Sequence, residues 1–141
     1  MYDAIVTDFK NTHAYIVFCI TAENFEPNEI TQLLQITPSY THKKGDKGKY
    51  SGKELQCASW EIHTKSEEVY DLGIQLDELL QMLKDKSEVL SEIKKIYLEC
   101  SFKFSVVVYT RNGFLPGIYL NRSQLELINL IQAEIEYDVY L

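Results

Sequence analysis

Residues 97–110 read YLECSFKFSVVVYT, and this stretch decides the fold class. Large apolar residues from Phe102 to Val108 occupy one parity of the stretch, and polar residues from Ser101 to Ser105 occupy the other. An alternation with a period of two predicts a long β-strand with one face in the core. The domain is therefore expected to be built around a sheet.

Three other segments are also typical of strands. Residues 13–22, HAYIVFCITA, are β-branched and aromatic, which predicts a strand covered on both faces. In residues 57–64, Ala58, Trp60 and Ile62 alternate with polar residues. Residues 135–140, IEYDVY, alternate in the same way. Residues 2–9 are expected to form a weaker strand or an arm, and residues 117–120 a short strand.

Apolar residues at helical spacing predict helices between these strands. Pro27 suits a first helical turn, and Pro38 ends the same helix. Gly73 weakens the start of the second helix. Ser87 is expected to cap the third helix, and Ser123 with Glu126 to form a capping box for the last. The expected helices span residues 27–37, 67–84, 87–96 and 125–134.

The order of these elements predicts an α+β fold. Helices alternate with antiparallel hairpins, which favours an antiparallel sheet with helices mainly on one face, in the ferredoxin-like split βαβ arrangement. The chain has 141 residues, the usual length of one domain. We therefore expect a single α+β domain over residues 1–141.

Composition and charge limit the function classes. The formal net charge is −7, which disfavours general nucleic-acid binding and suits a basic protein partner. Cys19, Cys57 and Cys100 form no CxxC motif, and free cysteines in apolar runs fit a reducing compartment. Neither a signal peptide nor a membrane-spanning stretch is visible. The expected localisation is cytoplasmic, without membrane binding.

No motif in the chain indicates catalysis. His13, His42 and His63 lie far apart in sequence, so no metal site is predicted. Neither a nucleophile elbow nor a local cysteine signature occurs. We expect a protein that is not an enzyme and needs no cofactor.

Two surfaces are candidates for binding. Residues 43–53 hold five of the fourteen Lys and Arg residues and read as an exposed loop that could contact an anion. Trp60 is expected in the core, or in a pocket wall beside this loop, with a partner for its indole N–H. The acidic C-terminal end is the second surface. The candidate residues are Lys43, Lys44, Gly45, Asp46, Lys47, Lys49, Trp60, Glu134, Glu136 and Asp138.

These segments together resemble a known family. EITQLLQITPS at 29–39, Gly45-Asp46 in a variable loop, Trp60 on a strand and the late segment 116–140 are similar to the bacterial family called domain of unknown function 4279. The resemblance extends from residue 13 to 141 and implies a compact α+β domain with no established activity. It supplies no catalytic residues.

The sequence leaves two binding functions open. The first is a non-catalytic protein-binding domain, as an immunity or accessory protein; small domains of this general type resemble immunity proteins encoded beside secreted toxins. The second is a small-molecule or anion-binding domain that uses the loop 43–53 and Trp60. The sequence does not decide between a monomer and a homodimer, although an edge strand at 135–140 could pair with a second copy.

Overall fold

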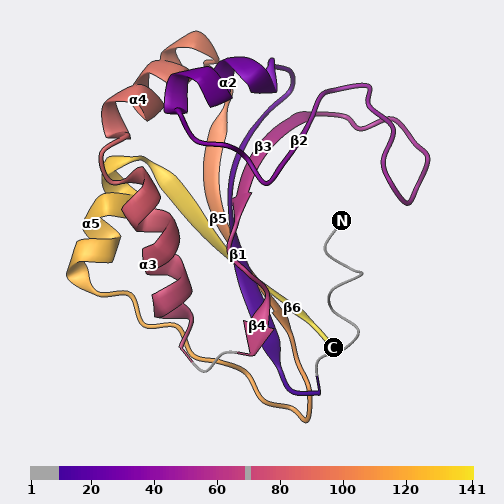
Figure 1. Ribbon diagram of the computed structural model, residues 1–141, viewed down its shortest axis with the longest axis vertical. Coiled ribbons are helices and arrows are strands. Elements are labelled where there is room, and N and C mark those ends of the chain that lie inside the picture. The colour runs from indigo at the N-terminus through magenta and orange to yellow at the C-terminus, as the bar shows by residue number, and fades with distance from the viewer. Residues whose placement is uncertain (1–9, 69–70) are drawn as a thin grey trace.

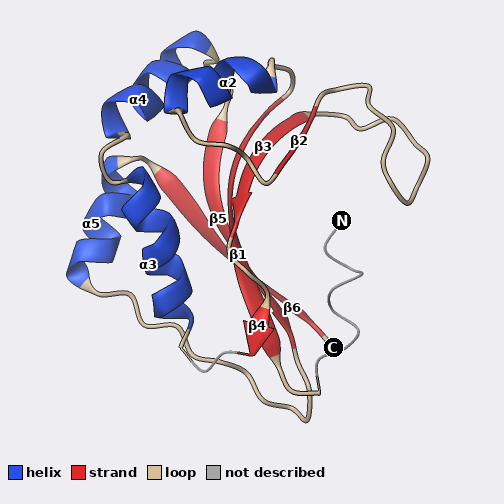
Figure 2. Cartoon of the chain, in the orientation of Figure 1, coloured by secondary structure: helices blue, strands red, loops and turns tan. Residues whose placement is uncertain are grey.

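The computed structural model describes residues 10–68 and 71–141, and these residues form an α+β fold. A mixed, open sheet of six strands has four helices on one of its faces in the described part of the chain (Figures 1 and 2). The predicted α+β class is confirmed. The other face of the sheet carries no helix among the described residues (Figure 2), and we call it the open face.

The six strands are joined around one central strand. The sheet order is β2-β3-β1-β5-β6, and β4 also pairs with β1. Only β5 and β6 are parallel among the described strands; the other pairs are antiparallel. The strand bounds are β1 His13–Ala22, β2 Tyr40–His42, β3 Ala58–His63, β4 Glu67–Glu68, β5 Ser101–Tyr109 and β6 Ala133–Tyr140.

The core lies between the sheet and the helices. The even-numbered residues of β1 and β5 face the helices, and Phe18 and Phe104 pair across the two strands with ring centroids 5.0 Å apart. Trp60 and Ile62 of β3 share this face. The alternation that predicted one core face for β5 and β3 is therefore confirmed.

Four helices cover the core face: α2 Pro27–Leu34, α3 Leu72–Leu83, α4 Ser87–Ile96 and α5 Arg122–Leu130. α2 ends earlier than predicted because Gln35 adopts a left-handed conformation (φ 58°), and its N–H donates to the Thr31 carbonyl. Asp71 caps α3 by accepting a hydrogen bond from the Gly73 N–H, at 2.8 Å. The α3 face that packs on the sheet is made of leucines and of Gln75.

The ferredoxin-like detail is not confirmed. In a split βαβ unit, a further strand lies between the two parallel strands. Here β5 and β6 are joined through α5 and are direct neighbours, in the register Phe102↔Ala133 to Tyr109↔Tyr140. The prediction failed because strand neighbours in a sheet are set by long-range packing, which local periodicity does not encode.

Several local predictions also need correction. Residues 117–120 form no strand; Gly117 makes only an isolated bridge to Asp71. The start of the segment 67–84 is the short strand β4, so the helix there begins only at Leu72. The cap of α5 is Asn121, in a capping box with Gln124, and Ser87 is the first residue of α4 rather than its cap. The strand or arm predicted at residues 2–9 lies outside the described residues.

A buried polar network fills the gap that β1 leaves between its pairings with β3 and β4. The Thr64 hydroxyl accepts a hydrogen bond from the Ile16 N–H and donates to the Gln75 side chain, both at 2.8 Å. The Gln75 side-chain amide donates to the Ala14 carbonyl at 3.0 Å. This network fixes α3 to β1 at the point where ladder hydrogen bonds are interrupted.

Candidate functional site

The open face collects the odd-numbered side chains of β1, β3 and β5 and the even-numbered side chains of β6. Register partners in neighbouring strands point to the same side of a sheet. Tyr109 of β5 is therefore beside Tyr140 of β6, and Val107 is beside Asp138. The open face thus combines residues as far apart in the sequence as Tyr15 of β1 and Tyr140 of β6.

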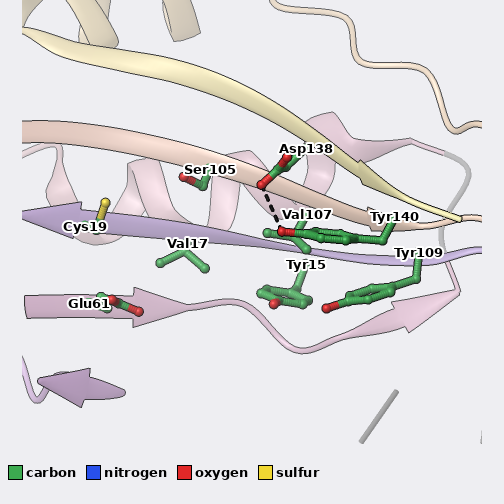
Figure 3. A pocket seen from close by; sticks show the side chains of 9 residues that line it. All are labelled: Tyr15, Val17, Cys19, Glu61, Ser105, Val107, Tyr109, Asp138 and Tyr140. Carbon is green, nitrogen blue, oxygen red and sulfur yellow. Dashed lines mark hydrogen bonds between the residues drawn. The ribbon is translucent and has the colours of Figure 1, made fainter. Parts of the chain in front are cut away.

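A cavity of about 410 Å³ lies on the open face (Figure 3). Three tyrosines, Tyr15, Tyr109 and Tyr140, line one end of the cavity, and their rings gather there in Figure 3. The Tyr109 and Tyr140 rings stack with centroids 5.1 Å apart. The other lining residues are Val17, Cys19, Glu61, Ser105, Val107 and Asp138. The cavity therefore has aromatic and aliphatic walls with a carboxylate on either side.

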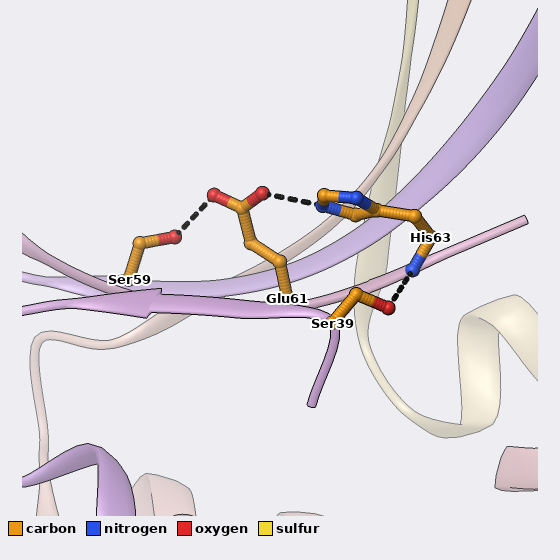
Figure 4. Close-up of polar contacts among 4 residues, drawn as sticks. All are labelled: Ser39, Ser59, Glu61 and His63. Atoms are coloured by element: carbon orange, nitrogen blue, oxygen red, sulfur yellow. Dashed lines mark hydrogen bonds and ion pairs between the residues drawn. The ribbon is translucent and has the colours of Figure 1, made fainter. Parts of the chain in front are cut away.

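Glu61 connects this cavity to a second hollow of about 330 Å³ that Tyr40, His42 and Tyr50 help to line. Ser59 donates a hydrogen bond to Glu61 Oε2, and His63 Nε2 lies 2.8 Å from Glu61 Oε1 (Figure 4). The Glu61 side chain is only 14% exposed. A carboxylate of β3 is thus held on the open face by two side chains of its own strand.

The order of these three side chains differs from that of a hydrolytic triad. In a triad, histidine lies between the nucleophile and the acid, so that it can accept the nucleophile's proton. Here the acid lies between Ser59 and His63. The arrangement orients a carboxylate and does not prepare Ser59 for attack through His63.

Cys19, on the floor of the cavity, is a poor nucleophile. Burial, and next the negative charge of Glu61, raise the pKa of its thiol to about 11. Cys19 therefore stays protonated near neutral pH. Because the thiolate is the reactive form of cysteine, the protonated thiol reacts slowly. Burial also raises the pKa of Cys100.

We predict that alkylation separates the three cysteines. Cys57 is partly exposed, whereas Cys19 and Cys100 are buried. Iodoacetamide at pH 7.5 should label Cys57 of the native protein, and the other two only after unfolding, as mass spectrometry of tryptic peptides would show. Equal labelling of Cys19 and Cys57 in the native state would contradict this account of the cavity.

The predicted acidic residues form a row on the open face of β6. Glu134, Glu136 and Asp138 are at alternate positions of the strand and therefore point the same way. Lys103 lies 2.9 Å from Glu136, which raises the pKa of the lysine through their hydrogen bond. Asp138 accepts a hydrogen bond from the Tyr140 hydroxyl, which raises the pKa of that tyrosine. We call Glu134, Glu136 and Asp138 the acidic row.

The basic loop is less available to an anion than its composition suggested. Lys43 and Lys44 form ion pairs with Glu26 and Glu23, each at 2.8 Å. The Lys49 ammonium lies 5.7 Å from the centroid of the Tyr50 ring. The strand β2 ends at His42, directly before the loop, and an isolated bridge pairs Lys47 of the loop with Glu54.

Gly45 and Asp46 shape a turn in this loop. Asp46 Oδ2 accepts a hydrogen bond from the Lys43 N–H at 2.8 Å, as expected for an aspartate in a turn. Gly45 has a φ of 93°, which favours glycine. Both residues therefore have a structural role in the turn.

Trp60 lies in the core. Its side chain is 0% exposed, and its indole N–H donates to the Thr31 hydroxyl of α2 at 2.9 Å. It faces the helices and not the open face, so a pocket wall beside the basic loop does not fit its position. The expectation of a core tryptophan with a protein partner for its N–H is confirmed.

The tyrosine end of the cavity was not predicted from the sequence. Tyr15 and Tyr109 are at odd-numbered positions, whereas the core residues of β1 and β5 are at even-numbered positions. This alternation was the one signal in the sequence that places the two tyrosines on the open face. Their approach to Tyr140 depends on the parallel pairing of β6, which no local pattern shows. Within residues 10–68 and 71–141, no group of three His, Cys, Asp or Glu residues could hold a metal ion.

No helix in the described residues is long and apolar enough to cross a membrane.

Comparison with known proteins identifies the family. Neither a curated protein nor a solved structure matches the chain. Residues 11–141 match the family described as domain of unknown function (DUF4279). Because this match covers nearly the whole chain, the protein belongs to the DUF4279 family.

Proposed function

We propose that this protein is a non-catalytic binding domain that receives a basic partner protein on the open face of its sheet. One observation carries the proposal: the acidic row and the Tyr140 ring lie together on the sheet face that the described helices leave uncovered. The Tyr140 side chain is 46% exposed and stacks on Tyr109.

The chemistry of this surface suits lysine and arginine. An exposed aromatic ring attracts a cation through its negative face, and a neighbouring carboxylate adds a charge-assisted hydrogen bond. Of the three carboxylates in the acidic row, only Glu136 has a basic side chain in ion-pair contact among the described residues. The net charge of −7 favours fast association with a basic protein. An immunity or accessory role is the biological setting we propose, and a toxin gene beside this one would support it.

The alternative, an anion-binding function, receives no support from the geometry of the basic loop. Lys43 and Lys44 are already paired with glutamates, and Trp60 lies on the opposite face of β3. We therefore do not propose it.

Charge reversal tests the proposal. The immobilised domain should retain a partner from a lysate of its own cells at low salt and release it at high salt, because exposed charges are screened. The double variant Glu134→Lys/Asp138→Lys should retain about tenfold less of the same partner, which corresponds to about 1.4 kcal/mol of binding free energy. Quantitative mass spectrometry of the eluates measures the difference.

A matched control has the same net charge as the test variant. Glu78→Lys/Glu92→Lys makes the same change of net charge on exposed positions of α3 and α4, the helices of the other face. This control should retain the partner nearly as well as the unmodified protein. Equal losses in both double variants would mean that total charge matters and the open face does not.

A further inference from the structure

No other described strand pairs with the outer edge of β6. β6 is the last strand in the sheet order, with β5 on its inner side. The Tyr140 carbonyl points inward, because it accepts a hydrogen bond from the Thr110 N–H at 2.9 Å. The N–H and C=O of one residue in a strand point to the same side, and successive residues alternate. The backbone groups of Ile135, Tyr137 and Val139 therefore point outward.

These outward groups have no hydrogen-bond partner among the described residues. The edge is also accessible, since all three side chains are more than a third exposed. At the opposite edge of the sheet, β2 has only three residues, Tyr40–His42. β6 has eight residues and is therefore the edge with room for a further strand.

A second copy of this chain is a poor occupant of the edge. In an antiparallel pair of β6 strands, residues whose backbone groups point outward lie directly opposite one another. Residues whose backbone groups point toward β5 then also lie opposite one another. Registers that pair the middle of the two strands place the acidic row of one copy opposite that of the other, and like charges directly opposite destabilise a strand pair. A parallel pair of copies would instead place each carboxylate beside an apolar residue.

We propose that the β6 edge accepts an extended segment of a partner protein as an added antiparallel strand, with cationic and apolar residues alternating along that segment. The cationic residues lie beside the acidic row on the open face, and the apolar residues lie beside Ile135, Tyr137 and Val139 on the other face. The proposal rests on the proposed function and specifies how the basic partner is bound.

Amide hydrogen exchange tests this proposal directly. The probe is a capped heptapeptide with lysine at positions 1, 3, 5 and 7 and valine between them, added to the ¹⁵N-labelled domain. Strand addition should slow exchange at the Ile135, Tyr137 and Val139 amides by about tenfold or more, because these gain hydrogen bonds. The amides of Glu136 and Asp138 already point toward β5 and should change much less.

Peptide variants supply the controls. N-methylation of the three valines removes the donors that face β6 and should abolish the protection, whereas N-methylation of lysines 3 and 5 should preserve it. A glutamate–valine heptapeptide should not bind.

If the lysine peptide binds without protecting the three outward amides, strand addition is wrong but the open face still binds cations. If the peptide does not bind while the charge-reversal experiment succeeds, strand addition is again wrong and the proposed function stands.

Discussion

Replacement of Trp60 by alanine is expected to lower the free energy of unfolding by about 3–5 kcal/mol. Trp60 is fully buried where β3 packs against α2, so alanine leaves a cavity and removes the N–H that donates to the Thr31 hydroxyl. Urea denaturation followed by far-ultraviolet circular dichroism would measure the change, since Trp60 is the single tryptophan and cannot report on its own replacement.

Two control variants make this measurement specific. Trp60→Phe keeps a buried ring and should cost clearly less than alanine. Tyr119→Ala removes a side chain that is 79% exposed and should change the stability by no more than about 0.5 kcal/mol. A cost below about 1 kcal/mol for Trp60→Ala would contradict a core position.

Gln75→Leu is expected to destabilise the protein by about 2–4 kcal/mol, although leucine is the more hydrophobic residue. Gln75 is buried and makes hydrogen bonds to Thr64 and to the Ala14 carbonyl. Leucine leaves the buried Thr64 O–H without its acceptor and removes the amide donor of the Ala14 carbonyl. The loss of these buried hydrogen bonds costs more than the added apolar contact gains.

Gln81→Leu is the matched control, because Gln81 is exposed on the same helix. Its effect should be within about 0.5 kcal/mol in the same denaturation experiment. If Gln75→Leu were neutral or stabilising, the Thr64–Gln75 network would not be what joins α3 to β1.

The sequence predicted those parts of the fold that local periodicity determines. The long strands at 13–22 and 101–109 and the helix at 87–96 lie where their apolar patterns indicate. The strand β2 and the bridge at Lys47 were missed because they occur in a polar segment without alternation. Residues 117–120 alternate weakly, but no neighbouring strand pairs with them beyond one bridge.

The candidate site was only partly predictable. The acidic row was found because its members are close in sequence and alternate on one strand. The tyrosine cavity was not found, since Tyr15 and Tyr140 come from opposite ends of the chain and meet only through the order β1-β5-β6. Gln75 could have been noticed, because it shares the helix face of Leu72 and Leu79.

The central claim is that the open face binds a basic partner. Calorimetry tests it most directly, by measuring the dissociation constant of the partner recovered from the lysate for two tyrosine variants. Tyr140→Ala removes the exposed ring beside the acidic row, and Tyr119→Ala removes an exposed ring outside the cavity lining. Tyr140→Ala should weaken binding by about tenfold or more, and Tyr119→Ala should leave binding unchanged. Unchanged binding by Tyr140→Ala would contradict the claim that the open face holds the partner.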